Sequence, residues 1–412
     1  MRAALLALLA AVGLCPGARA QAPGYEVVRQ EQSCPKDREA RSLRQTVVIL
    51  DEAIVTAQGD ANQAWKRMVV EAADAREVSL GTLGARERLT LLVARRDGTE
   101  LVPLFVGCSP NLPSDEVERA RAADSQVDRF LGNDSESRTK KVRDGFSGGI
   151  ARALAQVAKR ADATAATPVQ TGAFLRALQN AGRLADPNLG LPRFILVSPF
   201  QVAPKGEGAG VAAARERGFA LAERSALDFG RAEIYLAGAA LGDGDGLEFA
   251  RALILGSKGV LVAARSDGLP RLQAEPVSLR VYAGFIDYVG QRVPLQLRLA
   301  ATAQGDLVDS WVETTISRST ATPIGGKMLC RGDTCEVRSD GRLAQVWFPD
   351  PQGEPADRGR LPFGGARYFE LAVRGSTASG RIYDPKVEFR GEGATRRDEL
   401  RFEVQRIDDS QF

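Results

Sequence analysis

The chemistry open to this chain is limited first by the absence of histidine from its 412 residues. Without histidine there is no Ser-His-Asp or Cys-His catalysis, no histidine general base and no histidine metal ligand. If the cysteines are oxidised, carboxylate chemistry, lysine chemistry and oxygen-ligated metals remain. An enzyme built on this sequence would depend on paired carboxylates, and no such pair can be singled out from spacing.

The placement of the cysteines predicts disulfides. Of the five cysteines, Cys15 lies within the first 20 residues and four follow later in the chain. An even number of cysteines in an exported chain indicates disulfides, and four cysteines allow three pairings. Cys330 and Cys335 are so close in sequence that we expect them to pair, which leaves Cys34 with Cys108.

The local cysteine pair encloses an Arg-Gly-Asp tripeptide, since Cys330 to Cys335 read CRGDTC. A constrained Arg-Gly-Asp loop has the form of a cell-adhesion ligand. The chain is rich in these three residue types, however, and roughly 0.3 occurrences of the tripeptide are expected by chance. We expect a disulfide-stapled β-turn here, and adhesion through Arg331, Gly332 and Asp333 is the alternative.

The first 20 residues predict export. A basic start at Arg2, an apolar run ending at Cys15 and small residues before Gln21 are typical of a secretory signal. Lipid attachment at Cys15 is the alternative, which the bulky Leu14 disfavours. No apolar run is long enough to span a bilayer, and the interspersed charges, net +3, show no nucleic-acid-binding stripe. We expect a periplasmic or secreted protein that is not membrane-spanning and binds no nucleic acid.

Two regions of different pattern must position the chemistry-bearing residues, after an N-terminal arm at 21–41. From 42 to 268, apolar strands alternate with helical segments, which predicts an α/β domain with a mostly parallel sheet flanked by helices. Asp97 and Gly98 between two apolar runs predict a hairpin, so one strand should be antiparallel. Residues 277–412 show short alternating runs separated by turns, which predicts an all-β sandwich or small barrel domain.

The α/β region resembles a von Willebrand factor type A domain, a Rossmann-like family, over residues 42–268. Members of that family bind a divalent metal through Asp-x-Ser-x-Ser after the first strand, a Thr before a helix and an Asp that ends the fourth strand. Here "LDEAIV" retains Asp51 and "VQTGAFLRAL" retains Thr171. The other three ligand positions hold Ala53, Val55 and Ser198. The resemblance implies a retained scaffold with a degenerate metal-ion-dependent adhesion site, and we expect no cofactor, because Mg²⁺ requires several oxygen ligands. In this topology Cys34 and Cys108 would reach the same sheet edge, which supports their pairing.

Ligands of open α/β sheets bind outside the carboxyl ends of the strands. This rule predicts a binding rim made of Asp51, Glu52, Thr171, Ser198, Phe200, Asp243 and Asp245. The stretch GDGDGLE around Asp243 and Asp245 resembles a calcium loop but lacks its later bidentate Glu, so we expect turn or helix-capping chemistry there.

For function, these observations favour a non-catalytic protein–protein interaction or scaffold protein of the cell envelope that uses the rim. Two alternatives stay open. One is a carboxylate-dependent hydrolase. The other is a metal-dependent adhesin that holds Mg²⁺ or Ca²⁺ with Asp51 and Thr171.

Overall fold

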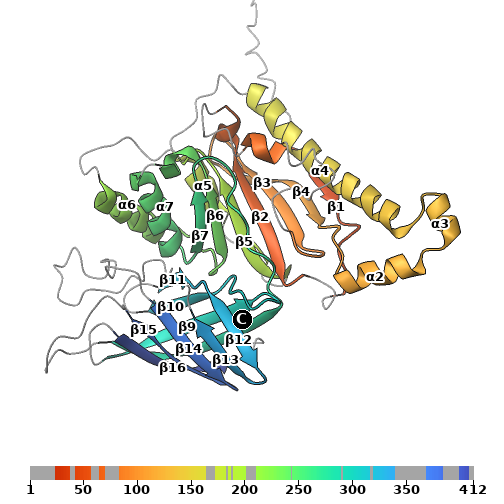
Figure 1. Cartoon of the computed structure of the whole chain (residues 1–412). Helices are drawn as coiled ribbons and strands as arrows, with labels where there is room; N and C mark the ends of the chain where they lie inside the picture. Colours follow the sequence, from red (N-terminus) through yellow and green to blue (C-terminus); the bar gives the residue numbers. More distant parts are fainter. Residues whose placement is uncertain are drawn as a thin grey trace, which may run out of the picture.

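The computed structural model describes residues 24–37, 42–56, 65–69, 83–163, 172–181, 184–186, 189–200, 210–242, 244–288, 291–315, 319–338, 368–383 and 399–407. An α/β domain precedes a β domain along the chain, and the two lie against each other (Figure 1). The predicted signal at 1–20 and the predicted rim residues Thr171 and Asp243 lie outside the described residues.

The sheet of the α/β domain is mostly parallel, as predicted. Its strands within the described residues are β1 (Val28–Gln30), β2 (Arg44–Asp51), β3 (Arg88–Ala94), β4 (Leu101–Cys108), β5 (Leu191–Val197), β6 (Glu233–Ala237) and β7 (Val260–Arg265). Their order is β1-β4-β3-β2-β5-β6-β7. The predicted hairpin is confirmed, because β3 and β4 pair antiparallel. Strand β1 was not predicted; it adds parallel to β4 from within the N-terminal arm.

Helices cover both faces of this sheet (Figure 1). The described helices are η2 (Glu52–Thr56), α2 (Ser114–Ala123), α3 (Gln126–Phe130), α4 (Ser135–Ala163), α5 (Ala173–Asn180), α6 (Val211–Arg224), η5 (Ala239–Gly242) and α7 (Gly244–Gly256). Successive side chains of a strand point to opposite faces. Val48 of β2 therefore packs in the same apolar cluster as Leu154 of α4, whereas Val47 packs with Phe174 of α5 and Ile254 of α7. The uninterrupted apolar run of β2 is explained by burial on both sides.

The β domain is one continuous antiparallel sheet that curves into a half-barrel around a single core. Its described strands are β8 (Ser278–Tyr288), β9 (Gln291–Ala301), β10 (Trp311–Thr315), β11 (Ser319–Pro323), β12 (Lys327–Arg331), β13 (Thr334–Arg338), β14 (Tyr368–Arg374), β15 (Thr377–Tyr383) and β16 (Glu399–Ile407). Their order is β11-β10-β9-β8-β16-β15-β14-β13-β12. The predicted all-β character of this region is confirmed.

The two domains share a packed junction. Edge strand β11 contacts both β7 and α7. Val260 of β7, Trp311 of β10 and Ala321 of β11 form one buried apolar cluster across it. The β domain therefore covers the end of the α/β sheet from which β2, β5 and β6 begin.

Both predicted disulfides are present, Cys34–Cys108 and Cys330–Cys335. Disulfides persist in oxidising compartments, which fits a protein that works outside the cytoplasm. In the part of the chain that the structure describes, none of the helices has the length and apolarity needed to span a membrane.

Candidate functional site

Four predicted rim residues lie where β2 and β5 end, and Asp51 is bonded within the fold. Its Oδ2 accepts a hydrogen bond from Ser198 Oγ at 2.7 Å, and its Oδ1 accepts one from the backbone N–H of Ala53 at 2.9 Å. Asp51 and Ser198 are both buried, and burial raises the pKa of Asp51 above its ordinary value. Asp51 thus closes the turn after β2 and ties it to β5.

Glu52 is equally engaged. Its carboxylate accepts hydrogen bonds from Tyr25 Oη at 3.1 Å and from the backbone N–H of Arg96 at 3.0 Å. Arg160 of α4 places its Nε 3.2 Å from the same group. Burial and the nearby Glu52 charge raise the pKa of Tyr25. Glu52 therefore joins the N-terminal arm, the β3–β4 hairpin and α4, which is a structural arrangement.

The remaining described rim residues, Phe200 and Asp245, do not form a binding site together with Asp51 and Glu52. Phe200 is buried with a positive φ of 46°, and its ring meets Phe174 edge to face at 5.8 Å. Asp245 Oδ2 accepts a hydrogen bond from the backbone N–H of Gly210 at 3.1 Å, at the start of α6. The described rim residues are thus engaged with neighbouring segments of the fold.

The donor set around Asp51 fits a divalent metal poorly. Both of its oxygens already accept hydrogen bonds, and Ala53 and Val55 offer no side-chain oxygen. Among the residues that the structure describes, no three His, Cys, Asp or Glu side chains gather as a metal site would require.

We predict that millimolar Mg²⁺, Ca²⁺ or EDTA leaves the thermal unfolding midpoint of the protein unchanged. A ligand that binds the folded state at 100 times its Kd stabilises it by about 2.7 kcal/mol, which a melt detects readily. The Asp51→Asn variant, measured in parallel, should show the same insensitivity to metal. A metal-dependent rise in midpoint that Asp51→Asn abolishes would instead establish the residual metal site.

A helical projection formed by residues 114–145 stands away from both domains (Figure 1). It comprises α2, α3 and the first part of α4. Neither α2 nor α3 contains a buried residue. From Phe146 onward α4 packs on the sheet, where Phe146 meets Phe105 edge to face at 5.3 Å. One helix therefore belongs to the α/β core at one end and to the projection at the other.

Polar contacts hold the projection in shape. Arg86 forms an ion pair with Glu116 of α2. Asp124, between α2 and α3, accepts hydrogen bonds from the backbone N–H of Ser135 at 2.9 Å and from its Oγ at 2.6 Å, and these bonds lower the pKa of Asp124. A capping box between Ser125 and Asp128 begins α3. Such contacts order the helices without burying apolar surface.

Three apolar side chains at the far end of the projection form what we call the apolar tip: Val127, Phe130 and Leu131. They are 64, 89 and 61 % exposed. Apolar residues at positions i, i+3 and i+4 share one helix face, which normally packs on a core. Within the described residues this face joins none of the buried apolar clusters, and clustered exposed apolar residues mark interaction sites. The signal was visible in the sequence, but its spacing also fits a buried helix.

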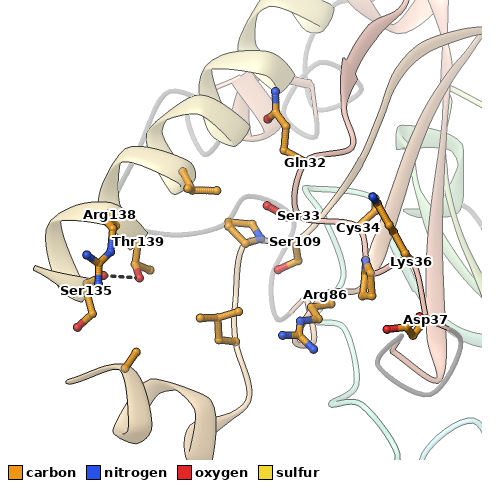
Figure 2. Close-up of a pocket in the computed structure, with 15 residues that line it drawn as sticks. Gln32, Ser33, Cys34, Lys36, Asp37, Arg86, Ser109, Ser135, Arg138 and Thr139 are labelled. Atoms are coloured by element: carbon orange, nitrogen blue, oxygen red, sulfur yellow. Dashed lines mark hydrogen bonds between the residues drawn. The ribbon is translucent and has the colours of Figure 1, made fainter. Parts of the chain in front are cut away.

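A groove of about 490 Å³ lies at the base of the projection. Figure 2 shows Ser135, Arg138 and Thr139 of α4 on one side, and Lys36 and Asp37 of the N-terminal arm on the other. Hydroxyl and cationic groups thus line a concave surface beside the projecting helices. Because the Cys34–Cys108 disulfide anchors the arm beside this surface, the groove has one covalently fixed wall.

The Arg-Gly-Asp tripeptide lies at the tip of the β12–β13 hairpin. Arg331 pairs with Thr334, so Gly332 and Asp333 form a two-residue turn, and Gly332 has the positive φ of 60° that this turn requires. The expected stapled turn is confirmed. All three residues of the tripeptide are exposed, and adhesion through them stays an untested prediction.

In comparisons with known proteins, no protein family, no curated protein and no solved structure matches the chain.

Proposed function

We propose that this chain is an exported, non-catalytic protein that binds a protein partner of the cell envelope through its helical projection. The observation that carries the proposal is the apolar tip, where Phe130 is 89 % exposed at the end of an ordered helical element. In this proposal Phe130 is the anchor, and the groove at the base of the projection receives the polar part of the same partner. The von Willebrand A-like ancestry of the α/β domain belongs to the proposal as well.

The energetics of the projection support a binding role. Short helices are marginal in water, and most helices in proteins are stabilised by packing an apolar face. In α2 and α3 that packing is missing, and exposed ion pairs contribute only about 0 to 1 kcal/mol each. An external surface that covers the tip would supply the packing that the chain itself does not.

The chemistry of the projection favours a protein over the other possible occupants. Residues 114–145 contain eight acidic and seven basic side chains, so the projection has no net positive charge to attract anionic lipid, even though four of the basic residues lie close together from Arg138 to Arg143. In a two-fold dimer formed through the tip, the apolar tip of one copy would meet the identical tip of the other instead of a complementary recess. The apolar tip, carried by an otherwise polar projection, would fit an apolar recess on a different protein.

We predict that Phe130→Ser weakens partner binding roughly thirtyfold, because a buried aromatic anchor contributes about 2 kcal/mol or more. Its unfolding midpoint should stay at the wild-type value, since the Phe130 ring is 89 % exposed. Phe285→Ser is the matched control, because it removes a 44 % exposed phenylalanine from the β domain. This control should bind normally.

Site-specific photo-crosslinking in the producing cell identifies the partner and tests the surface. A photoreactive residue at Val127 should give a discrete protein adduct that Phe130→Ser abolishes. The same residue at Val277, which is also 64 % exposed but far along the chain, should give no such adduct. Identical adducts at both positions, an adduct unaffected by Phe130→Ser, or crosslinking of position 127 to lipid alone would contradict the proposal.

A further inference from the structure

Six buried charged residues meet where the β domain covers the starts of β2, β5 and β6. Three are arginines and three are carboxylates: Arg44, Arg193, Arg298, Glu87, Glu233 and Asp309. Arg298 and Asp309 belong to the β domain and the other four to the α/β domain. The cluster therefore crosses the domain junction, although Arg193 and Glu87 pair within the α/β domain and Arg298 and Asp309 pair within the β domain.

Asp309 is the residue of the β domain that reaches across. Its backbone N–H donates to Glu233 Oε1 at 2.7 Å and to Gln273 Oε1 at 3.1 Å. Its carboxylate accepts a hydrogen bond from Arg298, whose Nε donates to the Asp309 carbonyl at 3.0 Å. Asp309 also adopts a positive φ of 46°, unusual for a residue other than glycine. This backbone conformation persists because the contacts around it fix the turn.

The groups that face Asp309 from the α/β domain carry both signs. Glu233 of β6 brings a second carboxylate to the same place, and Arg44 of β2 lies 3.5 Å from Glu233. Behind them Arg193 of β5 pairs with Glu87 at 2.8 Å.

From the β-domain side the surrounding charges are Arg298 and, further along the junction, Glu313, which forms an ion pair with Arg231 of the α/β domain. Arg298 also donates to the carbonyl of Arg231 at 3.0 Å, which binds β9 to the α/β domain. Two buried carboxylates, Asp309 and Glu233, thus lie at the junction between the domains, each beside an arginine.

We propose that this junction is a proton-linked hinge, which is most tightly closed when Asp309 carries a proton and which loosens when that carboxyl ionises. The junction holds the protonated form because the closed interface removes water from Asp309 and places Glu233 beside it. Opening returns water to the carboxyl and separates it from Glu233.

The expected direction of the pH effect follows from this difference. Burial, with help from Glu233 and against the opposing charges of Arg298 and Arg44, raises the pKa of Asp309 from 3.8 to about 7. A group whose pKa is raised in the closed state stabilises that state fully below its ordinary pKa. The stabilisation is lost as pH rises through about 7.

Hydrogen–deuterium exchange of the full mature chain tests the hinge. After correction for intrinsic exchange, the peptide that contains Asp309 should be on the order of tenfold better protected at about pH 5.5 than at about pH 8. A peptide from strand β4, which contributes none of the six charged residues, serves as the internal reference and should show no such change.

Asp309→Asn removes the titrating group. In this variant the hydrogen-exchange protection of the junction should therefore be independent of pH. The matched control is Asp306→Asn, which alters an exposed carboxylate of the same loop and should keep the wild-type profile. If Asp309→Asn fails to fold, the wild-type and Asp306→Asn profiles still decide. Equal protection of the wild-type junction at both pH values, a pH-dependent loss of protection retained in Asp309→Asn, or a parallel change in β4 that signals global unfolding would overturn the hinge.

Discussion

Replacing Glu87 by Ala is expected to lower the free energy of unfolding by about 3 to 5 kcal/mol, the cost of leaving one partner of a buried ion pair alone. Glu87 and Arg193 are both fully buried and lie 2.8 Å apart. Glu87 also accepts hydrogen bonds from Thr46 and from the backbone N–H of Gly84. Its removal therefore strands a guanidinium charge and leaves two other donors unsatisfied. Urea unfolding with intact disulfides measures the loss.

A surface pair provides the control for this prediction. Glu336 and Arg338 form an ion pair with both side chains mostly exposed, so Glu336→Ala should change stability by less than about 1 kcal/mol. The double replacement Glu87→Met with Arg193→Met should recover much of the stability lost in Glu87→Ala, because it removes both buried charges. If Glu87→Ala lowered the free energy of unfolding no more than Glu336→Ala does, water would have to reach the Glu87–Arg193 ion pair.

The Cys34–Cys108 disulfide is expected to contribute about 4 kcal/mol, because it closes a long loop in the unfolded chain. Its cysteines are 74 positions apart. The double variant Cys34→Ser, Cys108→Ser should show this loss in urea unfolding. It should also free β1, three residues long, from its place on β4.

The second disulfide is the natural comparison. Cys330 and Cys335 are only 5 positions apart, so the same loop-entropy argument assigns their pair about 2 kcal/mol. Its removal should leave the α/β domain intact, because the bond lies within one hairpin of the β domain. Equal losses for the two double variants would contradict the entropic account.

The order of elements was predictable because long apolar runs have few structural options. A run such as Thr46 to Asp51 can be buried on both faces only in the middle of a sheet, and the structure places it there. Strand β1 was missed because three residues carry no periodicity and pair only where Cys34 anchors them. The disulfides followed from the even number of cysteines and from their sequence separation, with support from the sheet edge that the family resemblance assigns to Cys34 and Cys108.

The candidate site was much less predictable, for two physical reasons. Arg44 and Glu233 begin their strands, and Arg193 lies near the start of its own, where charged residues usually meet water. Nothing in the local sequence shows that a second domain covers them. Likewise, the spacing of Val127, Phe130 and Leu131 predicts an apolar helix face but not that the face lacks a core.

Helix α4 connects the projection rigidly to the core of the α/β domain. Its 29 residues run without a break from the projection into the core. The part before Phe146 extends roughly 16 Å beyond the contact with Phe105, at 1.5 Å per residue. A pull on Phe130 by a bound partner would act on α4 as a force on one arm of a lever, with Phe146 as its fulcrum. At the other end of that lever Arg160 forms an ion pair with Glu52, so a force at the tip would be transmitted to the turn after β2.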